Sequence, residues 1–317
     1  MQTVNNQAVG KATGKIILMG EHAVVYGEPS LAIPFPKATI QTTVTQSTGP
    51  ITVDCIYHNG LLTDVPERLS NLLTVVEVSL KALKQNMKDF SLKIDSSIPA
   101  ERGMGSSAAV AVATVRALFN YFEQELTHEQ LLELVNVSEV IAHGNPSGLD
   151  AAMTSGEQPL YYTKGKPFVP FKMSVDAYLV VADTGIKGQT REAVGSIAAL
   201  MKEHPEETMN DIHQLGELAD KAKTAIEENN PIDLGSYMHQ AHLLLDKLGV
   251  SNEQLNQLVD AALANGALGA KLTGGGRGGC MIALADSETT AQQISDALRE
   301  TGTSNTWIYQ LGDDSFE

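Results

Sequence analysis

The sequence predicts a two-domain protein of the α+β class. Its 317 residues exceed the usual size of a single hydrophobic core. Residues 31–56 alternate apolar and polar side chains, as strands of an antiparallel or mixed sheet do. Near residue 177 the pattern changes to one strand followed by several amphipathic helices. We therefore expect an N-terminal domain over residues 1–175 and a C-terminal domain over residues 176–317.

The composition excludes several classes of partner. A formal net charge of −16 argues against nucleic acid or an anionic membrane, because either would favour a basic face. Cys55 and Cys280 support neither a disulfide framework nor a cysteine metal site. No apolar run approaches the roughly 18 residues of a membrane span, and no signal peptide is apparent at the N-terminus. We expect a cytoplasmic location.

The first strand carries a lysine. Residues 1–13 are polar and are expected to fray, whereas residues 14–18 form an apolar run typical of a buried strand. Lysine is rarely buried without a partner, so Lys15 either reaches solvent or meets a carboxylate or phosphate. Glu21 and His22 follow this strand, in a specific tight turn or in an ordinary surface loop.

Periodicity predicts the remaining elements in order. Apolar residues repeat at helical spacing within the predicted helices, and Thr127 to Gln130 has the sequence of a capping box. The predicted elements are strands at 40–44 and 51–55, helices at 66–83, 112–122 and 127–142, a strand at 178–182, three or four helices up to residue 265, a strand at 281–285, a helix at 287–300 and a strand at 306–310.

The stretch Pro-Ala-Glu-Arg-Gly-Met-Gly-Ser-Ser-Ala-Ala at residues 99–109 joins a strand to a helix. Gly103 and Gly105 let the backbone approach a ligand closely, and Ser106 and Ser107 add hydroxyl and N–H groups. The first turn of the helix supplies unpaired N–H donors and the positive end of the helix dipole. Taken alone, the stretch fits a phosphate-binding loop or an ordinary capped turn.

Two further segments have the composition of functional loops. Glu139, at the edge of an apolar helical stripe, would by itself be a flank residue. The sequence His-Gly-Asn-Pro-Ser-Gly-Leu-Asp then leads to Asp150, with Pro146 ending the helix and pushing Asn145 to an extended conformation. The glycine-rich residues 271–280 are too tightly placed between a helix and an apolar strand for a flexible linker, and they predict a second loop that approaches a ligand.

The loops at 15–27, 99–109 and 271–280 resemble, in order and content, those of the GHMP small-molecule kinases. The run Gly-Glu-His-Ala-Val-Val-Tyr-Gly at residues 20–27 is most similar to the mevalonate kinases of that superfamily, and the spacing of Glu139 and Asp150 also matches. The resemblance implies the two-domain GHMP kinase fold, with an N-terminal domain like ribosomal protein S5 domain 2 and a ferredoxin-like C-terminal domain. It also implies ATP-dependent phosphorylation of the primary hydroxyl of mevalonate to 5-phosphomevalonate, in isoprenoid biosynthesis.

The resemblance implies roles for individual residues. Asp150 would accept the proton of the attacking hydroxyl, with Lys15 beside it; because little bond formation has occurred in a loose transition state, an ordinary aspartate suffices. The other implied contacts are, for the ATP phosphates, Arg102, Gly103, Met104, Gly105, Ser106 and Ser107; for Mg²⁺, Ser107 and Glu139; and for the acceptor, Glu21, His22, Thr190 and Gly275. The expected partners are ATP and a small molecule, and the sequence leaves a homodimer open.

A local set of basic residues would hold the anionic ligands of this acidic chain. These residues lie in or next to the proposed loops: Lys15, Arg102, Lys187, Arg191, Lys271 and Arg277. Arg277 stands where many family members have glycine, which leaves open whether the last loop closes on phosphate as usual or gains a cationic contact.

Two other functions compete with this hypothesis. A sibling kinase would act on phosphomevalonate, homoserine or a sugar, but a sugar kinase of this family is expected to have Thr-Asp after Glu-His, where this chain has Ala23 and Val24. A catalytically silent relative would bind ATP or a metabolite as a sensor. Such a sensor has no need of a proton acceptor, so the presence of Asp150 argues against it.

Overall fold

The computed structural model describes residues 6–143 and 147–312. These form two compact units: the described parts of residues 1–15, 38–99 and 105–156, and those of 16–37, 100–104 and 157–317. The units are discontinuous because strands β1 (Gln7–Met19) and β2 (Pro29–Pro50) contribute residues to both. The division between residues 175 and 176 stays a prediction.

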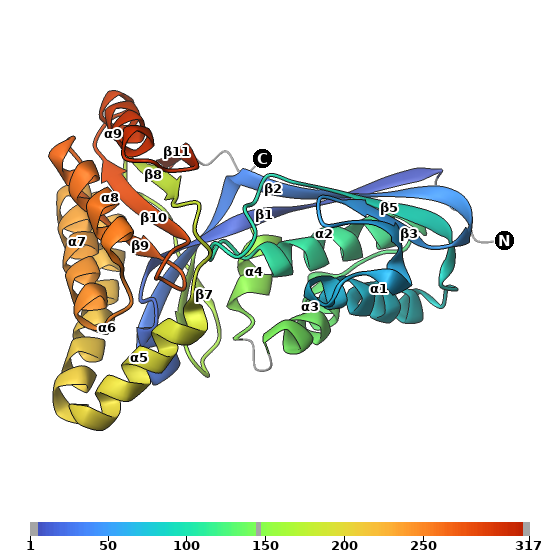
Figure 1. The fold of residues 1–317 in the computed structure, drawn as a ribbon, viewed down its shortest axis with the longest axis horizontal. Coiled ribbons are helices and arrows are strands. Elements are labelled where there is room, and N and C mark those ends of the chain that lie inside the picture. Colours follow the sequence, from blue (N-terminus) through green and yellow to red (C-terminus); the bar gives the residue numbers. More distant parts are fainter. Residues whose placement is uncertain (1–5, 144–146, 313–317) are drawn as a thin grey trace. The chain divides into compact units, whose positions relative to one another are not determined.

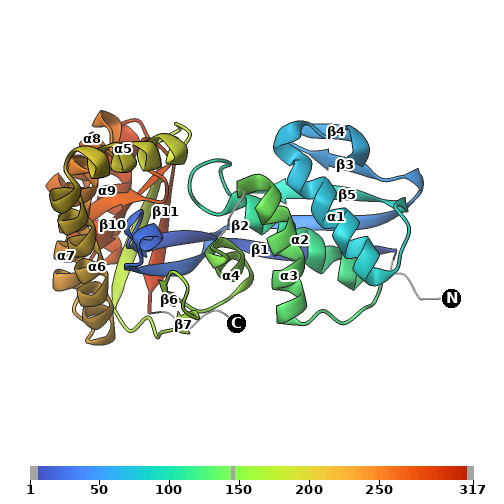
Figure 2. The same cartoon turned by 90° about the horizontal axis from the view of Figure 1, so that it is seen from below.

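The first unit is a sheet covered by helices on one face (Figures 1 and 2). The strand order is β4-β3-β5-β2, with β1 beside β2, and β5 runs antiparallel to β2 and parallel to β3. The predicted alternation holds only in part of β2: Ile40, Thr42 and Val44 are buried, but so are Thr43 and all of residues 29–35. The other elements of this unit are β3 (Thr52–Cys55), β4 (His58–Leu61), β5 (Lys88–Ser96), α1 (Ser70–Leu83), α2 (Ser106–Tyr121), α3 (His128–His143) and α4 (Leu149–Ser155).

Helix α2 packs closely on β1. A side chain at Gly10 would lie only 2.1 Å from the carbonyl oxygen of Ala113, so glycine is required there. The prediction that residues 1–13 fray is wrong for residues 7–13, which form the first half of β1. Their small residues are buried at every second position beneath α2, and this packing stabilises a strand of weak intrinsic propensity.

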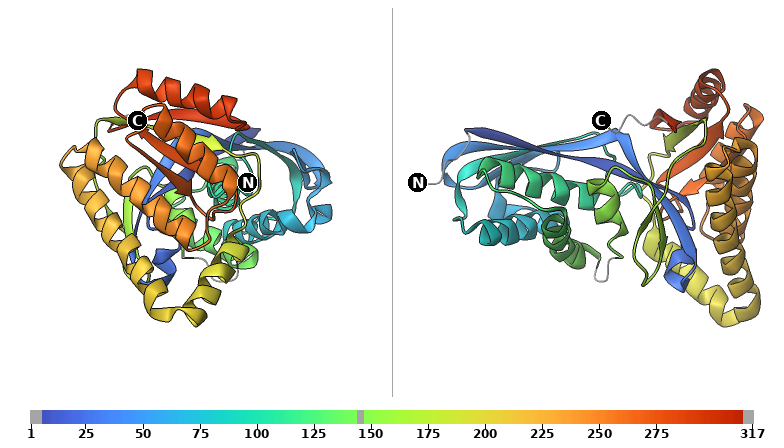
Figure 3. Two further views of the ribbon diagram at one scale, coloured as in Figure 1. Left: turned by 60° about the vertical axis from the view of Figure 1, so that its left-hand side comes forward. Right: turned by 180° about the vertical axis from the view of Figure 1, so that it is seen from behind.

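The second unit contains an antiparallel sheet of order β11-β8-β10-β9. Of its central strands, β10 is buried throughout and β8 is buried at every position except the half-buried Tyr178. Helices α7, α8 and α9 pack against one face of the sheet (Figure 3). Its elements are β8 (Ala177–Asp183), β9 (Gly269–Thr273), β10 (Cys280–Ala285), β11 (Asn305–Leu311), α5 (Thr190–Glu203), α6 (Pro205–Glu227), α7 (Pro231–Lys247), α8 (Glu253–Ala264) and α9 (Glu288–Glu300).

The start of β2 joins this second unit. Its residues 29–32 pair with β6 (Leu160–Thr163), which pairs with β7 (Val169–Pro170). Phe35 packs edge-on against Trp307 and Tyr309 of β11, with ring centroids 6.3 and 5.8 Å apart. Short 3₁₀ turns occur at Ala23–Tyr26, Leu62–Asp64 and Glu67–Leu69. None of the described helices has the length and apolar character needed to cross a membrane.

Candidate active site

The glycine loop and the start of α2 occupy the first unit from Gly105 onward. Gly105 precedes the helix with φ 71°, a left-handed conformation that favours glycine. A Cβ there would lie 2.9 Å from Cγ of Lys15 and 3.1 Å from Cγ2 of Thr154. Ser106 and Ser107 therefore begin a 16-residue helix whose first-turn N–H groups suit an anion.

Lys15 and Asp150 form an ion pair, with Nζ 3.1 Å from Oδ1. Of the two fates predicted for Lys15, the structure therefore selects the carboxylate partner. Asp150 lies in the first turn of α4, after Gly148 at φ 78°; the preceding turn predicted at Asn145 and Pro146 lies outside the described residues. The Lys15 side chain is 7% exposed and that of Asp150 40% exposed. A carboxylate open to solvent thus lies beside a fixed positive charge.

Ser107 is part of a second polar group in this unit. Its Oγ donates a hydrogen bond to Oε1 of Glu139 at 2.8 Å and accepts one from Nδ2 of Asn71 at 2.9 Å. Glu139 is buried, which does not fit an ordinary helix-flank residue. Sequence reasoning missed Asn71, a polar residue in the first turn of α1. Its burial distinguishes it from other polar helix residues, and that burial is visible only in the structure.

The side chains of Ser107 and Glu139 fit a magnesium ion. Mg²⁺ prefers hard oxygen ligands and usually keeps several waters, so one carboxylate and one hydroxyl with substrate phosphates suffice. Within the described ranges, no cluster of three or more His, Cys, Asp or Glu side chains could hold a metal by itself. Any metal held by Ser107 and Glu139 would therefore need the oxygens of a bound ligand.

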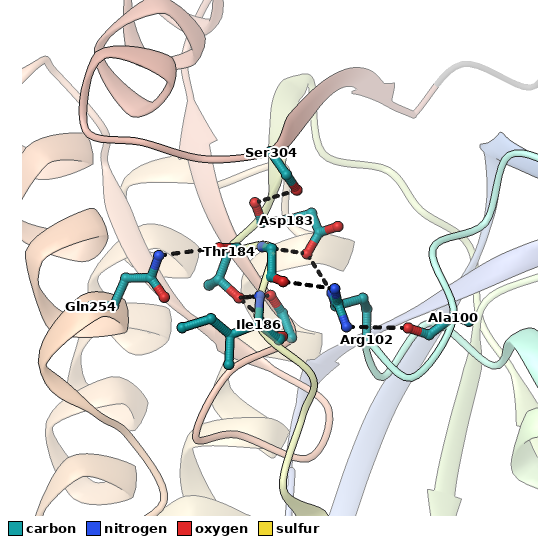
Figure 4. A network of polar contacts seen from close by, with 9 residues as sticks. Ala100, Arg102, Asp183, Thr184, Ile186, Gln254 and Ser304 are labelled. Atoms are coloured by element: carbon teal, nitrogen blue, oxygen red, sulfur yellow. Dashed lines mark hydrogen bonds and ion pairs between the residues drawn. The ribbon is translucent and has the colours of Figure 1, made fainter.

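The tip of the glycine loop belongs to the second unit, where Arg102 anchors it (Figure 4). Arg102 donates from Nε to Oδ1 of Asp183 and from Nη2 to the carbonyl of Gly185, both at 2.8 Å. A Cβ on Gly103 would lie 3.3 Å from Cα of Gly274, so the two glycine loops are in close contact here. Contacts of Arg102, Gly103 and the buried Met104 with ATP stay predictions.

Figure 4 also shows how Asp183 and its neighbour are fixed. Ser304 donates from both its backbone N–H and its Oγ to the Asp183 carbonyl, at 2.9 and 3.1 Å. Gln254 donates to the Thr184 carbonyl at 3.1 Å. The carboxylate that accepts from Arg102 therefore belongs to a strand end with several hydrogen bonds of its own, which connect the loop tip to β8.

Three of the predicted acceptor residues come together in the second unit. The Nε2 of His22 lies 3.1 Å from the carbonyl oxygen of Gly275. A Cβ on Gly275 would overlap Oγ1 of Thr190 at 1.9 Å, so only glycine fits between these residues. We call His22, Thr190 and Gly275 the His22 cluster. The pKa of His22 is lowered from 6.5 to about 4: burial is the main cause, the hydrogen bond with Gly275 opposes it, and the charge of Lys271 adds to it.

Glu21 has a partner that sequence reasoning missed. Lys271 was predicted to lie in the last glycine loop, but residues 271–273 belong to β9 and the loop begins at Gly274. The Lys271 ammonium forms an ion pair with Glu21 and donates to the carbonyl of Leu272 at 2.8 Å. Burial lowers the pKa of Lys271, while the nearby Glu21 carboxylate opposes that shift. The sequence offers one indication of a buried lysine here, which is that Lys271 directly precedes the apolar residue Leu272.

The basic residues do not form a free positive cluster. Five of the six predicted members have partners: Lys15 with Asp150, Arg102 with Asp183, Lys187 with Glu101, Lys271 with Glu21, and Arg277 with Ser196 and Gly249. Arg191 is exposed. Arg277 donates to Oγ of Ser196 at 2.6 Å and to the Gly249 carbonyl at 2.9 Å, so it ties the loop to α5 and to the turn after α7.

Comparison with known proteins places this arrangement in a family. Two family models match: GHMP kinases N terminal domain over residues 71–157, and GHMP kinases C terminal over residues 222–304. The mevalonate kinase of Pyrococcus abyssi is 35% identical over 315 aligned residues, which cover 93% of this chain and 92% of that protein. The chain belongs to the GHMP kinase family. The predicted family is thereby confirmed, and this GHMP kinase is an ATP-dependent kinase.

Solved structures agree with this assignment. The mevalonate kinase of methicillin-resistant Staphylococcus aureus is 34% identical with a TM-score of 0.76, covering 97% of this chain and 100% of that one. The L. major mevalonate kinase in complex with R-mevalonate is 26% identical with a TM-score of 0.83, covering 98% of both chains. The predicted two-domain GHMP kinase fold is confirmed.

Proposed function

We propose that this GHMP kinase transfers the γ-phosphoryl group of ATP to the primary hydroxyl of mevalonate, giving 5-phosphomevalonate for isoprenoid biosynthesis. The similarity to mevalonate kinases supports the choice of substrate. The ion pair between Lys15 and the exposed Asp150 carboxylate is the observation that carries the proposed chemistry. A binding protein without catalysis would have no need for this arrangement.

In the proposed reaction the hydroxyl oxygen attacks the γ-phosphorus. The bond from that phosphorus to the bridging oxygen breaks, ADP leaves, and the hydroxyl proton passes to Asp150. Because the transition state of phosphoryl transfer is loose, the proton can move late, and a positioned carboxylate is an adequate acceptor. Lys15 holds this carboxylate in place and adds positive charge where negative charge develops.

ATP would bind at the glycine loop and the start of α2. The backbone N–H groups of Ser106 and Ser107 would face the phosphates, and the glycines would let the main chain approach them. We assign the ATP contacts to Arg102, Gly103, Met104, Gly105, Ser106 and Ser107. Ser107 and Glu139 would hold Mg²⁺, which neutralises charge on the phosphates when it is bound.

The acceptor would lie against the His22 cluster and Glu21. The cluster offers a ring nitrogen, a hydroxyl and backbone groups within one small region, as a polyfunctional alcohol requires. Glu21 is almost fully buried against Lys271, so its part in binding the acceptor depends on how this ion pair acts. A homodimer and a cytoplasmic location stay predictions.

Coupled ADP release, measured with a panel of acceptors, tests the proposal. We expect Mg²⁺-dependent turnover with R-mevalonate and none above background with phosphomevalonate, homoserine or galactose. A reaction without acceptor corrects for ATP hydrolysis. Turnover of another alcohol alone would replace the substrate, and turnover of none, with ATP still bound in calorimetry, would favour a sensor.

A further inference from the structure

Lys271 is a fully buried lysine to which the proposed chemistry gives no part. Its side chain is 0% exposed and that of its partner Glu21 is 1% exposed. Taking two charges out of water costs free energy, and well-packed apolar residues often stabilise a protein as well as a buried ion pair does. Stability alone therefore does not account for this pair.

The pair anchors the turn that carries His22. Glu21 directly precedes His22, whose φ is 61°, a left-handed conformation that is uncommon outside glycine. The turn is closed by a hydrogen bond from the N–H of Ala23 to the Glu21 carbonyl at 2.7 Å. Lys271 of β9 forms its ion pair with the Glu21 side chain and lies four residues before Gly275. One short segment thus holds both Glu21 and the carbonyl that contacts His22.

The contact with Gly275 determines the tautomer of His22. A carbonyl oxygen only accepts, so Nε2 of His22 is the atom that bears hydrogen in the bond at 3.1 Å. With its pKa lowered to about 4, the ring is neutral at pH 7 and Nδ1 carries a lone pair. A lone pair accepts a hydrogen bond from a hydroxyl group but repels a carboxylate.

The ionisable groups around Lys271 agree with a neutral His22. His242 of α7 also feels the charge of Lys271. Its Nδ1 accepts a hydrogen bond from the N–H of Leu272 at 3.4 Å, and its Nε2 lies 3.1 Å from Oδ1 of Asn256. The pKa of His242 is lowered to about 4, mainly by burial and then by the charge of Lys271. Asp246 and the hydrogen bond with Asn256 oppose this shift, and His239 adds to it slightly. Within the part of the chain that the structure describes, the ammonium is paired with the Glu21 carboxylate, and the nearby imidazoles of His22 and His242 are neutral at pH 7.

We propose that the Lys271–Glu21 ion pair is a positioning element that holds His22 so that Nδ1 accepts a hydrogen bond from the tertiary hydroxyl of the acceptor alcohol. The proposal rests on the proposed function, and the tertiary hydroxyl is the hydroxyl group of mevalonate that the proposed reaction leaves unchanged. Lys271 and Glu21 act through His22, because their own side chains are sealed from solvent.

Two variants separate positioning from folding. Lys271→Met leaves a buried carboxylate without its partner, whereas Glu21→Gln combined with Lys271→Met removes both charges and should recover most of the lost thermal stability. In both variants we expect KM for mevalonate to rise about tenfold or more, with KM for ATP and kcat within about threefold of the parent. A double variant with the parent's KM for mevalonate would overturn the proposal.

Lys247→Met is the matched control. Lys247 of α7 pairs with Glu207 and Asp211 of α6 at 2.9 and 2.8 Å, so its replacement also breaks a lysine–carboxylate contact in the second unit. We expect an unchanged KM for mevalonate in this variant. A rise equal to that of Lys271→Met would mean that general loosening of the unit explains both effects, and it would overturn the proposal.

The second measurement does not depend on turnover. Nitrogen-15 NMR of the His22 ring, assigned with His22→Phe, should show hydrogen on Nε2 in the parent and an altered tautomer balance in the double variant. Hydrogen on Nδ1 in the parent would overturn the proposal. If the tautomer balance changes in the double variant as expected but mevalonate is not phosphorylated, the proposed substrate fails, whereas the positioning of His22 by the ion pair stands.

An analogue tests which hydroxyl is recognised. We expect the parent to prefer mevalonate over 5-hydroxy-3-methylpentanoate, which lacks the tertiary hydroxyl, by at least about tenfold in kcat/KM. His22→Phe should abolish most of this preference. Equal use of both alcohols by the parent would overturn the assignment of His22 to that hydroxyl.

Discussion

Each unit of the molecule contains a lysine–carboxylate pair whose lysine is buried, and these two pairs differ in the burial of the carboxylate. In the first unit Lys15 is buried but Asp150 is 40% exposed, whereas in the second unit Lys271 and Glu21 are 0% and 1% exposed. An exposed carboxylate can exchange a proton with a bound alcohol, while a sealed one can only hold its neighbours in place. We infer that the accessibility of the carboxylate, more than the residue types, separates the proposed catalytic pair from the proposed positioning pair.

Asp150→Asn should give the largest effect. An amide cannot accept the proton, so we expect kcat to fall by on the order of 10⁴-fold while the fold and ATP affinity persist. Single-turnover ADP release measures the loss of catalysis, and calorimetry with ATP on the same preparation measures the nucleotide affinity. Near-normal turnover would remove Asp150 as proton acceptor and with it the distinction between the two pairs.

Replacing the lysine of each pair should lower the free energy of unfolding by clearly different amounts. Lys271→Met leaves a buried charge without its partner and should lower the free energy of unfolding by roughly 3–5 kcal/mol. Lys15→Met leaves a carboxylate that water can solvate and should cost about 1 kcal/mol. Urea unfolding of both variants makes the comparison; equal losses would contradict the role assigned to burial.

Acid should destabilise the second unit through its buried histidines. Burial lowers the pKa of both His22 and His242 from 6.5 to about 4, so the unfolded chain binds more protons than the folded one between those values. The free energy of unfolding should therefore fall as the pH drops from 6.5 to 4, by about 1.4 kcal/mol per unit for each histidine.

Urea unfolding of the parent and of His242→Gln over this pH range measures the contribution. The variant should have the shallower dependence, because one of the two histidines is gone. An identical slope in parent and variant would show that His242 does not lose its proton affinity on folding.

Glu139→Gln should have the smallest effect. The amide keeps the shape and can still accept from Ser107, but it loses the negative charge that attracts the metal. We expect the Mg²⁺ concentration for half-maximal turnover to rise about tenfold, which corresponds to about 1.4 kcal/mol. Magnesium titration at saturating ATP tests this, and an unchanged requirement would return Glu139 to a structural role.

Much of the fold followed from local patterns. Alternation predicted β2 and β3, and one hydrogen bond of the predicted capping box is present, from the N–H of Gln130 to Oγ1 of Thr127 at 3.2 Å. The first half of β1 escaped prediction because its small and polar residues have weak strand propensity, and burial beneath α2 decides its conformation. The strand conformation of Lys271 was not predicted for a similar reason. A lysine followed by several glycines is typical of a loop, and only the pairing of β9 with β10 makes this segment a strand.

The sequence by itself determined the loops, their order, the family, and the candidacy of residues such as Lys15, Glu139 and Asp150. Only the tertiary structure decided which charges meet. Glu21 and Lys271 are 250 positions apart, and no periodicity links them. Their pairing depends on two distant segments packing so closely that water is excluded, and the burial that results separates this sealed pair from the open one at Asp150.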